Sequence, residues 1–251
     1  MSTGNKVSKG DIIRFEFDGY IADSGEMFDT TNADTAQENG IFNEKFKYAP
    51  MPLLVGGGRV FPGLEEALEG APIDEDVEVV IPPEKAAGQR DPKLIQMHSV
   101  REFLKQDIEP RPGMEVNMNN KTGLIISVTA GRVRVDFNRR FAGQALKYRF
   151  KVLEVVENDE EKAMAVVEMD YGTSEGFKVT VDGKKVTMVL PDVCKYDQKW
   201  TLAKYKVVAD LREALQANPV ELIEEYVKQE DKAEPTEDKE PEELGSEEDK
   251  S

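Results

Sequence analysis

The sequence predicts an α+β protein in which strands outnumber helices. Residues 11–21 and 146–156 alternate apolar and polar side chains, as a strand does when one face of its sheet is buried. Turn signals at Ala130-Gly131 and Asp182-Gly183 each join two shorter alternating runs and indicate hairpins. Only the C-terminal third has an extended helical pattern. With 251 residues, 39% of them apolar, the chain can form one large domain or two to three small ones.

The N-terminal region predicts one sheet and a short helix. In the first strand the apolar residues, Phe17 among them, share one face. Leu64 and Leu68 lie four residues apart in a helix expected at 63–69. The other elements expected here are a turn at 23–26, a strand at 27–29, a long loop with at most a short helix at 31–50, and strands at 51–55 and 77–81.

A glycine-rich stretch, VGGGRVFPGLEEALEGA at 55–71, contains that helix and the loop before it. Four residues separate Gly58 from Gly63, as in a phosphate-binding loop, but that motif continues with Lys and then Ser or Thr. Here Leu64 and Glu65 follow, and a carboxylate at a helix start repels a phosphate. We therefore expect the glycines to serve another purpose.

Residues 88–140 have the pattern of a separate, mostly β unit. Ser99 and Glu102 have the spacing of a capping box at the start of a short helix. A proline-rich turn, a strand at 114–118 and hairpin strands at 124–129 and 132–137 follow. The chain then returns to the long strand that matches the first one, so this unit is an insert.

A third unit follows residue 156. It begins with a charged segment at 157–162, expected to be a linker, and continues with a hairpin and helices at about 192–217 and 219–229. We expect an α+β domain at 157–229. Residues 230–251 hold eleven acidic residues, three lysines and no aromatic residue, so a disordered tail is expected there.

The composition argues against several functions. A net charge of −17 argues against nucleic acid and anionic membranes as partners. No stretch approaches the length of a transmembrane helix, and the first ten residues lack the pattern of a signal peptide. With one cysteine, Cys194, and one histidine, His98, neither a zinc cluster nor a His-based catalytic group is expected. We expect a cytoplasmic protein without cofactor or metal.

The order of the motifs resembles that of the FKBP-type peptidyl-prolyl isomerases. The stretches that carry the resemblance are FDG at 17–19, SGEMFDTT at 24–31, VFPGLEEAL at 60–68, AGQRD at 87–91 and FAGQALKYRFKVLEV at 141–155. The insert between the last two makes the chain similar to the SlyD-like branch, which carries an insert-in-flap chaperone domain. The domain after residue 157 looks like that of the long archaeal members. The resemblance covers residues 7–156 well and the rest by architecture alone.

The resemblance implies a division of the chain into four parts. An FKBP-type antiparallel sheet wrapped on a short helix is expected at 1–87 and 141–156. The small β-rich chaperone insert is expected at 88–140, the C-terminal α+β domain at 157–229, and the acidic tail at 230–251.

The resemblance also implies a proline-binding pocket between the sheet and the helix. Its expected residues are the aromatic walls Phe17, Phe28 and Tyr148, the acidic Asp29, the rim residues Val60 and Phe61, and Leu64 at the floor, where other members often have Trp. The backbone N–H of Phe61 is expected to bond the carbonyl of the bound peptide. The family usually has Ala-Tyr-Gly where this chain has Ala86-Ala87-Gly88, so the Tyr hydroxyl that bonds substrate is missing.

Two functional hypotheses remain open. The chain is either an isomerase that also acts as a folding chaperone on unfolded or nascent polypeptides, or a binding-only chaperone with weak or lost catalysis. The expected client-binding residues of the insert are Leu94, Met97, Phe103, Leu104, Met114 and Met118. The alternative for these residues is that they form the insert's own small core.

A homodimer through the C-terminal domain is also expected. The helix at about 192–217 carries an apolar stripe, and a three-stranded sheet can cover only one side of it. The alternative is that the helix expected at 219–229 folds back and covers the stripe. The stripe consists of Trp200, Leu202, Val207, Val208, Leu211 and Leu215.

Overall fold

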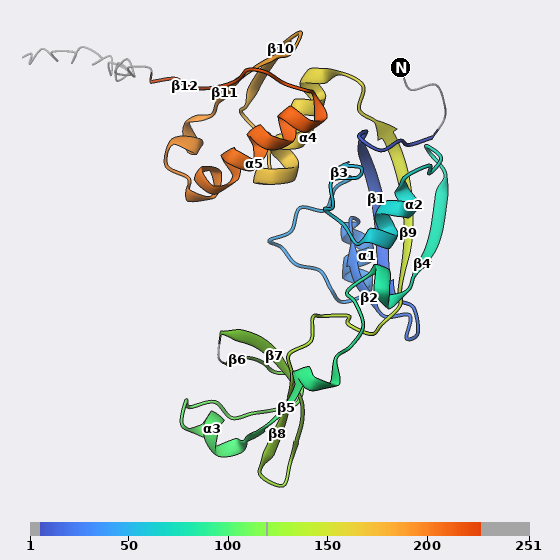
Figure 1. The fold of residues 1–251 in the computed structure, drawn as a ribbon, viewed down its shortest axis with the longest axis vertical. Coiled ribbons are helices and arrows are strands. Elements are labelled where there is room, and N and C mark those ends of the chain that lie inside the picture. The colour runs from blue at the N-terminus through green and yellow to red at the C-terminus, as the bar shows by residue number, and fades with distance from the viewer. Residues whose placement is uncertain (1–5, 119, 227–251) are drawn as a thin grey trace, which may run out of the picture.

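Three sheets follow one another along the long axis of the molecule (Figure 1). The structure is a computed structural model that describes residues 6–118 and 120–226, so the tail expected at 230–251 lies outside the described residues. We call the three parts the central domain (6–87 and 141–156), the insert (88–140) and the C-terminal domain (157–226). In Figure 1 the central domain lies between the other two.

The central domain is a five-stranded antiparallel sheet packed against one short helix. The strand order is β2-β1-β9-β4, and β3 pairs with the first part of β1. The inner face of the sheet buries Phe15, Phe150 and Val152 against Leu64 and Leu68 of the helix. The α+β class predicted from the alternating strands is confirmed. The elements are β1 (Ile12–Ile21), β2 (Met27–Thr30), β3 (Met51–Leu54), α2 (Pro62–Leu68), β4 (Asp76–Ile81) and β9 (Leu146–Val155).

The Phe-Pro-Gly sequence lets α2 begin close to the sheet. Phe61 is the N-cap of α2 and Pro62 occupies its first turn, where a missing N–H costs nothing. A Cβ atom added to Gly63 would lie 2.3 Å from Cγ2 of Ile81 on β4. Only glycine therefore permits this approach of helix and strand.

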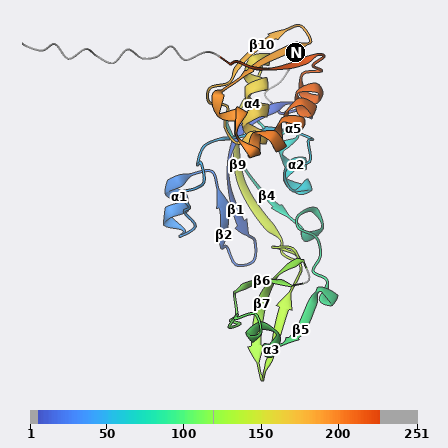
Figure 2. The same ribbon diagram turned by 90° about the vertical axis from the view of Figure 1, so that its left-hand side faces the viewer.

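A second short helix, α1 (Ala33–Glu38), forms within the segment predicted as a long loop. Its N-cap is Asn32, whose side chain accepts a hydrogen bond from the Thr35 N–H. Figure 2 shows α1 projecting from the side of the central sheet, away from α2. This agrees with the expectation of at most a short helix in residues 31–50.

The insert is a four-stranded antiparallel sheet in the order β5-β8-β7-β6, with one short helix. The capping box predicted at Ser99 and Glu102 is confirmed at the start of that helix. Strand β5 was not predicted, because residues 95–99 do not alternate regularly and are placed only by pairing with β8. The elements are β5 (Ile95–Ser99), α3 (Val100–Leu104), β6 (Glu115–Met118), β7 (Lys121–Thr129) and β8 (Arg132–Asp136), preceded by short 3-10 turns at Pro83–Lys85 and Pro92–Leu94.

The C-terminal domain packs two helices against a three-stranded sheet. The hairpin predicted around Asp182-Gly183 is confirmed. The strand order is β10-β11-β12, with β11 and β12 parallel. The elements are α4 (Asp159–Tyr171), β10 (Lys178–Asp182), β11 (Lys185–Leu190), a 3-10 turn (Asp192–Lys195), α5 (Gln198–Ala214) and β12 (Val220–Glu224).

Two predictions about this domain are wrong. The charged segment at 157–162 is not a linker, because Asn158 caps α4 and the acids after it form the first turn, where negative charge is favoured. The helix predicted at 219–229 is instead strand β12 in the described part. Val220 and Leu222 pack on the core in a period of two, and pairing with β11, distant in sequence, fixes that conformation.

The central and C-terminal domains share one hydrophobic core. Ile12, Leu54 and Val156 of the central domain lie in the same buried cluster as α4, α5 and the C-terminal sheet. Helix α4 lies between β3 and α5, and its buried residues extend around much of its circumference. The C-terminal domain thus packs on one end of the central sheet, where β1 begins and β9 ends (Figures 1 and 2).

Candidate active site

The aromatic residues predicted as pocket walls meet on the inner face of the central sheet. The ring centroids of Phe17 and Tyr148 lie 5.9 Å apart. Those of Phe28 and Tyr148 lie 5.8 Å apart with the rings nearly perpendicular, an edge-to-face contact. Tyr148 is buried, whereas Phe17 and Phe28 are half-buried and contribute partly exposed aromatic surface.

A β-bulge directs Phe28 into this cluster. Gly19 of β1 pairs with Asp29, but the next residue, Tyr20, pairs with Met27, so Phe28 has no partner across the ladder. Its ring lies directly over Gly19, where an added Cβ would be 2.8 Å from Phe28 Cζ. Gly19 is therefore a residue of the site that the sequence analysis did not single out, although it lies in the FDG motif.

The start of α2 forms the other side of the cluster. Val60 and Phe61 are half-buried, and Leu64 is buried beneath them. Within the described residues, no backbone or side-chain group accepts a hydrogen bond from the Phe61 N–H. This N–H group is available to a ligand, as the resemblance implies.

The glycine-rich loop before α2 is held by a carboxylate of the same helix. Glu65 Oε1 accepts hydrogen bonds from the N–H groups of Gly56, at 3.0 Å, and Gly58, at 2.9 Å. Both glycines have positive φ, which other residues rarely adopt. The amides that a phosphate would need are thus engaged by Glu65.

Two ionisable groups at the cluster have shifted pKa values. Partial desolvation raises the pKa of Asp29, although its side chain remains exposed, and the Thr30 N–H and the Arg140 charge oppose that shift. Burial is the main cause that raises the pKa of Tyr148, and the negative charge of Asp29 raises it further. The Tyr148 hydroxyl consequently stays protonated and can donate a hydrogen bond.

Phe141 is an additional wall residue that was not among the expected pocket residues, although it begins the motif at 141–155. Its ring centroid lies 4.5 Å from that of Phe28, and it packs on the core of the central domain. Its φ of 66° is unusual for a bulky residue and directs the ring into the cluster. The guanidinium of Arg140 lies 4.6 Å from the centroid of the same ring.

The residues expected to bind clients on the insert differ in exposure. Phe103 is buried in the insert's core with an exposed fraction of 1%, so its expected place on a client-binding surface is wrong. Its helix turns it against Val116 and Val133 of the sheet. Met97 and Leu104 are exposed by 58% and 54%, respectively. Of the others, Met114 is exposed, and Leu94 and Met118 are half-buried.

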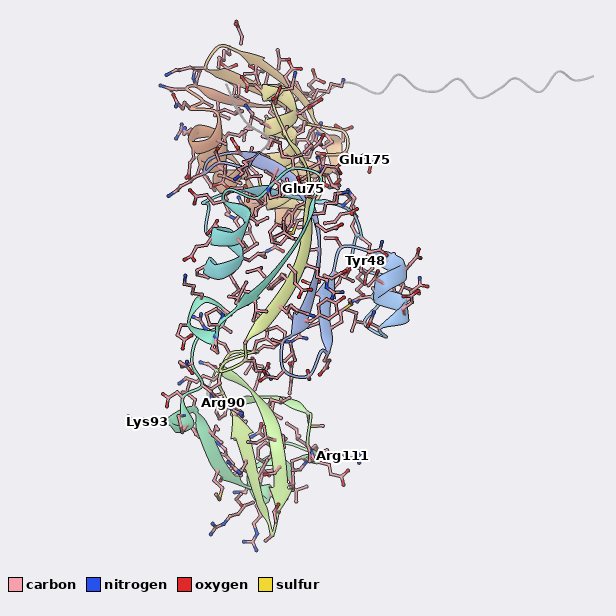
Figure 3. All side chains as sticks on the ribbon, turned by 90° about the vertical axis from the view of Figure 1, so that its right-hand side faces the viewer. Tyr48, Glu75, Arg90, Lys93, Arg111 and Glu175 are labelled. Atoms are coloured by element: carbon pink, nitrogen blue, oxygen red, sulfur yellow. The ribbon has the colours of Figure 1, made fainter. Side chains whose placement is uncertain are left out.

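A hollow of about 830 Å³ joins the central domain to the insert. Phe28 and Phe141 border it on one side, and Leu124 and Phe137 border it on the other. Arg90, labelled in Figure 3 where the chain enters the insert, also lines it and pairs with Asp136 of β8. The hollow thus connects exposed parts of both domains.

Residues 6–118 and 120–226 contain neither a candidate metal cluster nor a membrane-spanning helix. No group of three or more His, Cys, Asp or Glu side chains there could hold a metal ion. Within the same ranges, no helix combines the length and apolar character needed to cross a bilayer.

Three protein families match successive parts of the chain. The family described as FKBP-type peptidyl-prolyl cis-trans isomerase matches residues 3–104. The families described as FKBP26, IF domain, and FKBP26_C-terminal match residues 93–141 and 159–227, respectively. Their order along the chain is that of the central domain, the insert and the C-terminal domain.

Individual relatives are similar over the first two parts. The short-type peptidyl-prolyl cis-trans isomerase of Methanocaldococcus jannaschii is 36% identical over 151 residues, which are 60% of this chain and 95% of the relative. The FKBP-type peptidyl-prolyl cis-trans isomerase SlyD of Helicobacter pylori is 32% identical over 130 residues, 50% of this chain and 69% of the relative. SlyD of Escherichia coli is 33% identical over 130 residues, 50% of this chain and 66% of the relative. With these matches and the fold described above, the chain belongs to the FKBP-type peptidyl-prolyl cis-trans isomerase family.

Proposed function

We propose that the aromatic cluster of the central domain is the isomerase site and that the insert holds unfolded client chains for it. The observation that carries this proposal is the hollow of about 830 Å³ bordered by Phe28 and Phe141 at one end and by Leu124 of the insert at the other. Its size suits a short stretch of extended peptide. One client segment can therefore contact both domains at once.

The isomerisation needs neither a nucleophile nor a metal. Rotation about an X-Pro bond crosses a barrier of roughly 18–20 kcal/mol because the peptide bond has partial double-bond character. The twisted amide has lost this resonance and is less polar than the ground state. The aromatic wall formed by Phe17, Phe28, Phe141 and Tyr148 favours it, and the free Phe61 N–H fixes the peptide carbonyl.

The insert contributes affinity rather than chemistry. It exposes four large apolar side chains, Met97, Leu104, Met114 and Leu124, and Leu124 borders the hollow. Met side chains adapt to different partners, which suits a binder of unfolded chains. The clients are unfolded or nascent polypeptides, and a single cysteine suits the reducing cytoplasm.

A variant pair tests the isomerase site. Phe61→Ala should lower kcat/KM for a short X-Pro peptide by about tenfold or more, because it removes one rim of the pocket. Phe46→Ala removes the same side chain from an exposed loop position, 64% exposed, and should leave turnover unchanged. Protease-coupled or exchange NMR assays measure both. Equal turnover in the two variants would place the site elsewhere.

A second pair separates the chaperone from a pure isomerase. Replacing Met97, Leu104 and Leu124 by Ser should slow the refolding of a proline-limited protein while leaving short-peptide turnover intact. Val80→Ser, on the outer face of β4, removes an equally exposed apolar side chain and serves as the control. If the parent has no peptide turnover but still suppresses aggregation, the binding-only alternative holds.

A further inference from the structure

Arg59 links the rim of the isomerase pocket to the C-terminal domain. It directly precedes Val60 and Phe61 in the loop between β3 and α2. Its Nη2 lies 2.7 Å from Oδ1 of Asp170 on α4 and also contacts Oδ2 of Asp210 on α5. One guanidinium of the central domain thus bridges both helices of the C-terminal domain.

This ion pair is largely withdrawn from solvent. The side chain of Asp170 is fully buried, and those of Arg59 and Asp210 are each exposed by 14%. Lys206 lies 3.1 Å from the same oxygen of Asp170, but its side chain is much more exposed. The other oxygen of Asp170 has no hydrogen-bond partner in the described part of the chain. Asp170 therefore depends strongly on Arg59, and a buried pair of this kind holds its geometry tightly.

The loop is consequently fixed at two points. The carboxylate of Glu65 holds the N–H groups of Gly56 and Gly58 from the helix side. Arg59, the residue after Gly58, is held by its ion pairs with Asp170 and Asp210 of the C-terminal domain. Val60 and Phe61, the pocket rim, follow without an intervening flexible residue.

We propose that Arg59, Asp170 and Asp210 form a positioning clamp, through which the C-terminal domain sets the place of the pocket rim for catalysis. The proposal rests on the isomerase site described above. Arg59 itself does not contact the substrate; it acts through Val60 and Phe61. A rim displaced by about 1 Å can cost a large factor in rate while binding is nearly retained.

A second ion pair between the same domains provides a matched control. Arg14 of β1 lies 3.0 Å from Glu168 of α4, so it also joins the central and C-terminal domains. Arg14 is on the outer face of the sheet, away from the pocket rim. Losing it should loosen the domain contact without moving Val60 or Phe61.

The test uses full-length variants Arg59→Met, Arg59→Lys, Asp210→Asn, the double variant Arg59→Met/Asp210→Asn, and Arg14→Met. Exchange NMR on an X-Pro peptide gives kcat and KM, and thermal unfolding shows whether each variant is folded. We expect Arg59→Met to lower kcat by about tenfold with KM changed less than about twofold. Asp210→Asn should also lower kcat. The double variant should have a kcat no lower than that of Arg59→Met, because both substitutions break the same ion pair. Arg59→Lys should have a kcat between those of Arg59→Met and the parent. Arg14→Met should keep the parental kcat.

The outcomes distinguish the clamp from the site itself. A folded Arg59→Met variant with parental kcat overturns the clamp, and so does an equal loss in Arg14→Met, which would indicate general loosening. If Arg59→Met does not fold, Asp210→Asn decides in its place: a folded Asp210→Asn variant with parental kcat overturns the clamp. Phe61→Ala is measured beside them. If Phe61→Ala keeps full turnover, the isomerase site is misplaced; if it loses turnover while Arg59→Met does not, only the clamp fails.

Discussion

Tyr148 offers a hydroxyl in a pocket that lacks the family's usual one. The resemblance places Ala87 where other members have the Tyr that bonds substrate. The Tyr148 hydroxyl stays protonated because burial and the charge of Asp29 raise its pKa. Within the described residues it has no hydrogen-bond partner, so it can serve a peptide carbonyl.

Tyr148→Phe should therefore lower kcat/KM by about three- to tenfold, the worth of one hydrogen bond of roughly 1 kcal/mol. Stability should change little, because no intramolecular hydrogen bond is lost. Tyr20→Phe makes the same change on the outer face of the same sheet, beside Lys147, and should keep parental activity. Parental activity in Tyr148→Phe would show that the hydroxyl does not contact substrate.

Asp29→Asn should separate stability from activity. Desolvation raises the pKa of Asp29 above its ordinary 3.8, so its charged form is less favourable in the folded than in the unfolded chain. The neutral Asn variant should therefore be more stable at pH 7. This advantage should disappear as the pH falls through the raised pKa towards 3.8, because the parent then binds its proton.

Urea unfolding at a series of pH values measures the difference. We expect isomerase turnover to fall in Asp29→Asn at pH 7, since the negative charge beside Tyr148 is lost. A variant less stable than the parent at pH 7 would contradict the proposed desolvation.

At the scale of single elements, the loop and helix at 56–68 act as one unit. Glu65 bonds the N–H groups of two glycines that lie before its own helix, and Pro62-Gly63 starts that helix against Ile81. The loop therefore has little freedom although it is rich in glycine. This rigidity suits a pocket rim, which must keep its place during catalysis.

Glu65→Ala should cost about 1–3 kcal/mol in the free energy of unfolding, because two N–H groups lose a charged acceptor. Turnover should fall with it as the rim loosens. Glu66→Ala, on the next position of α2, removes only an exposed pair with Lys85 and should cost less than about 1 kcal/mol. Chemical denaturation and the peptide assay measure both variants; equal effects would argue against the role of Glu65 in the loop.

At the scale of the whole molecule, the shared core changes the argument for a dimer. Trp200, Val207 and Leu211 of the expected stripe are buried within one chain, because α4 covers the side of α5 that the sheet leaves free. Leu202 and Tyr205, exposed by 75% and 76%, remain uncovered one turn apart on α5, with Tyr196 exposed just before the helix. This smaller surface is where we propose that two copies associate.

Light scattering tests this association. At tens of micromolar we expect about twice the chain mass of 28.1 kDa, and Leu202→Glu/Tyr205→Glu should reduce it to one chain. Leu104→Glu places the same charge on an exposed leucine of the insert and should keep the dimer. A parental protein that scatters as a single chain would rule out the dimer. A dimer would present two pockets to one client and raise the effective concentration.

The sequence by itself determined the long strands of the central sheet, the hairpin turns and most of the candidate pocket residues. Alternation over 11–21, the Asp182-Gly183 turn and the capping box at Ser99 depend on neighbours only a few residues away, so they can be predicted without a tertiary structure. The candidate pocket residues were predicted from motifs that the resemblance supplied, each of which is contiguous in the chain.

Only the tertiary structure decided which contacts join segments distant in sequence. Phe28 lies over Gly19 because of a register shift between two strands, and Phe141 meets Phe28 only after the chain has traversed the insert. Strand β12 forms because β11 supplies its hydrogen-bond partners, which outweighs the local helical pattern. In the sequence, nothing distinguishes Arg59 from an arginine on the surface. Its partners, Asp170 and Asp210, lie more than a hundred residues further along the chain. Local patterns carry no information on such pairings, because their energy depends on burial and geometry that the whole fold creates.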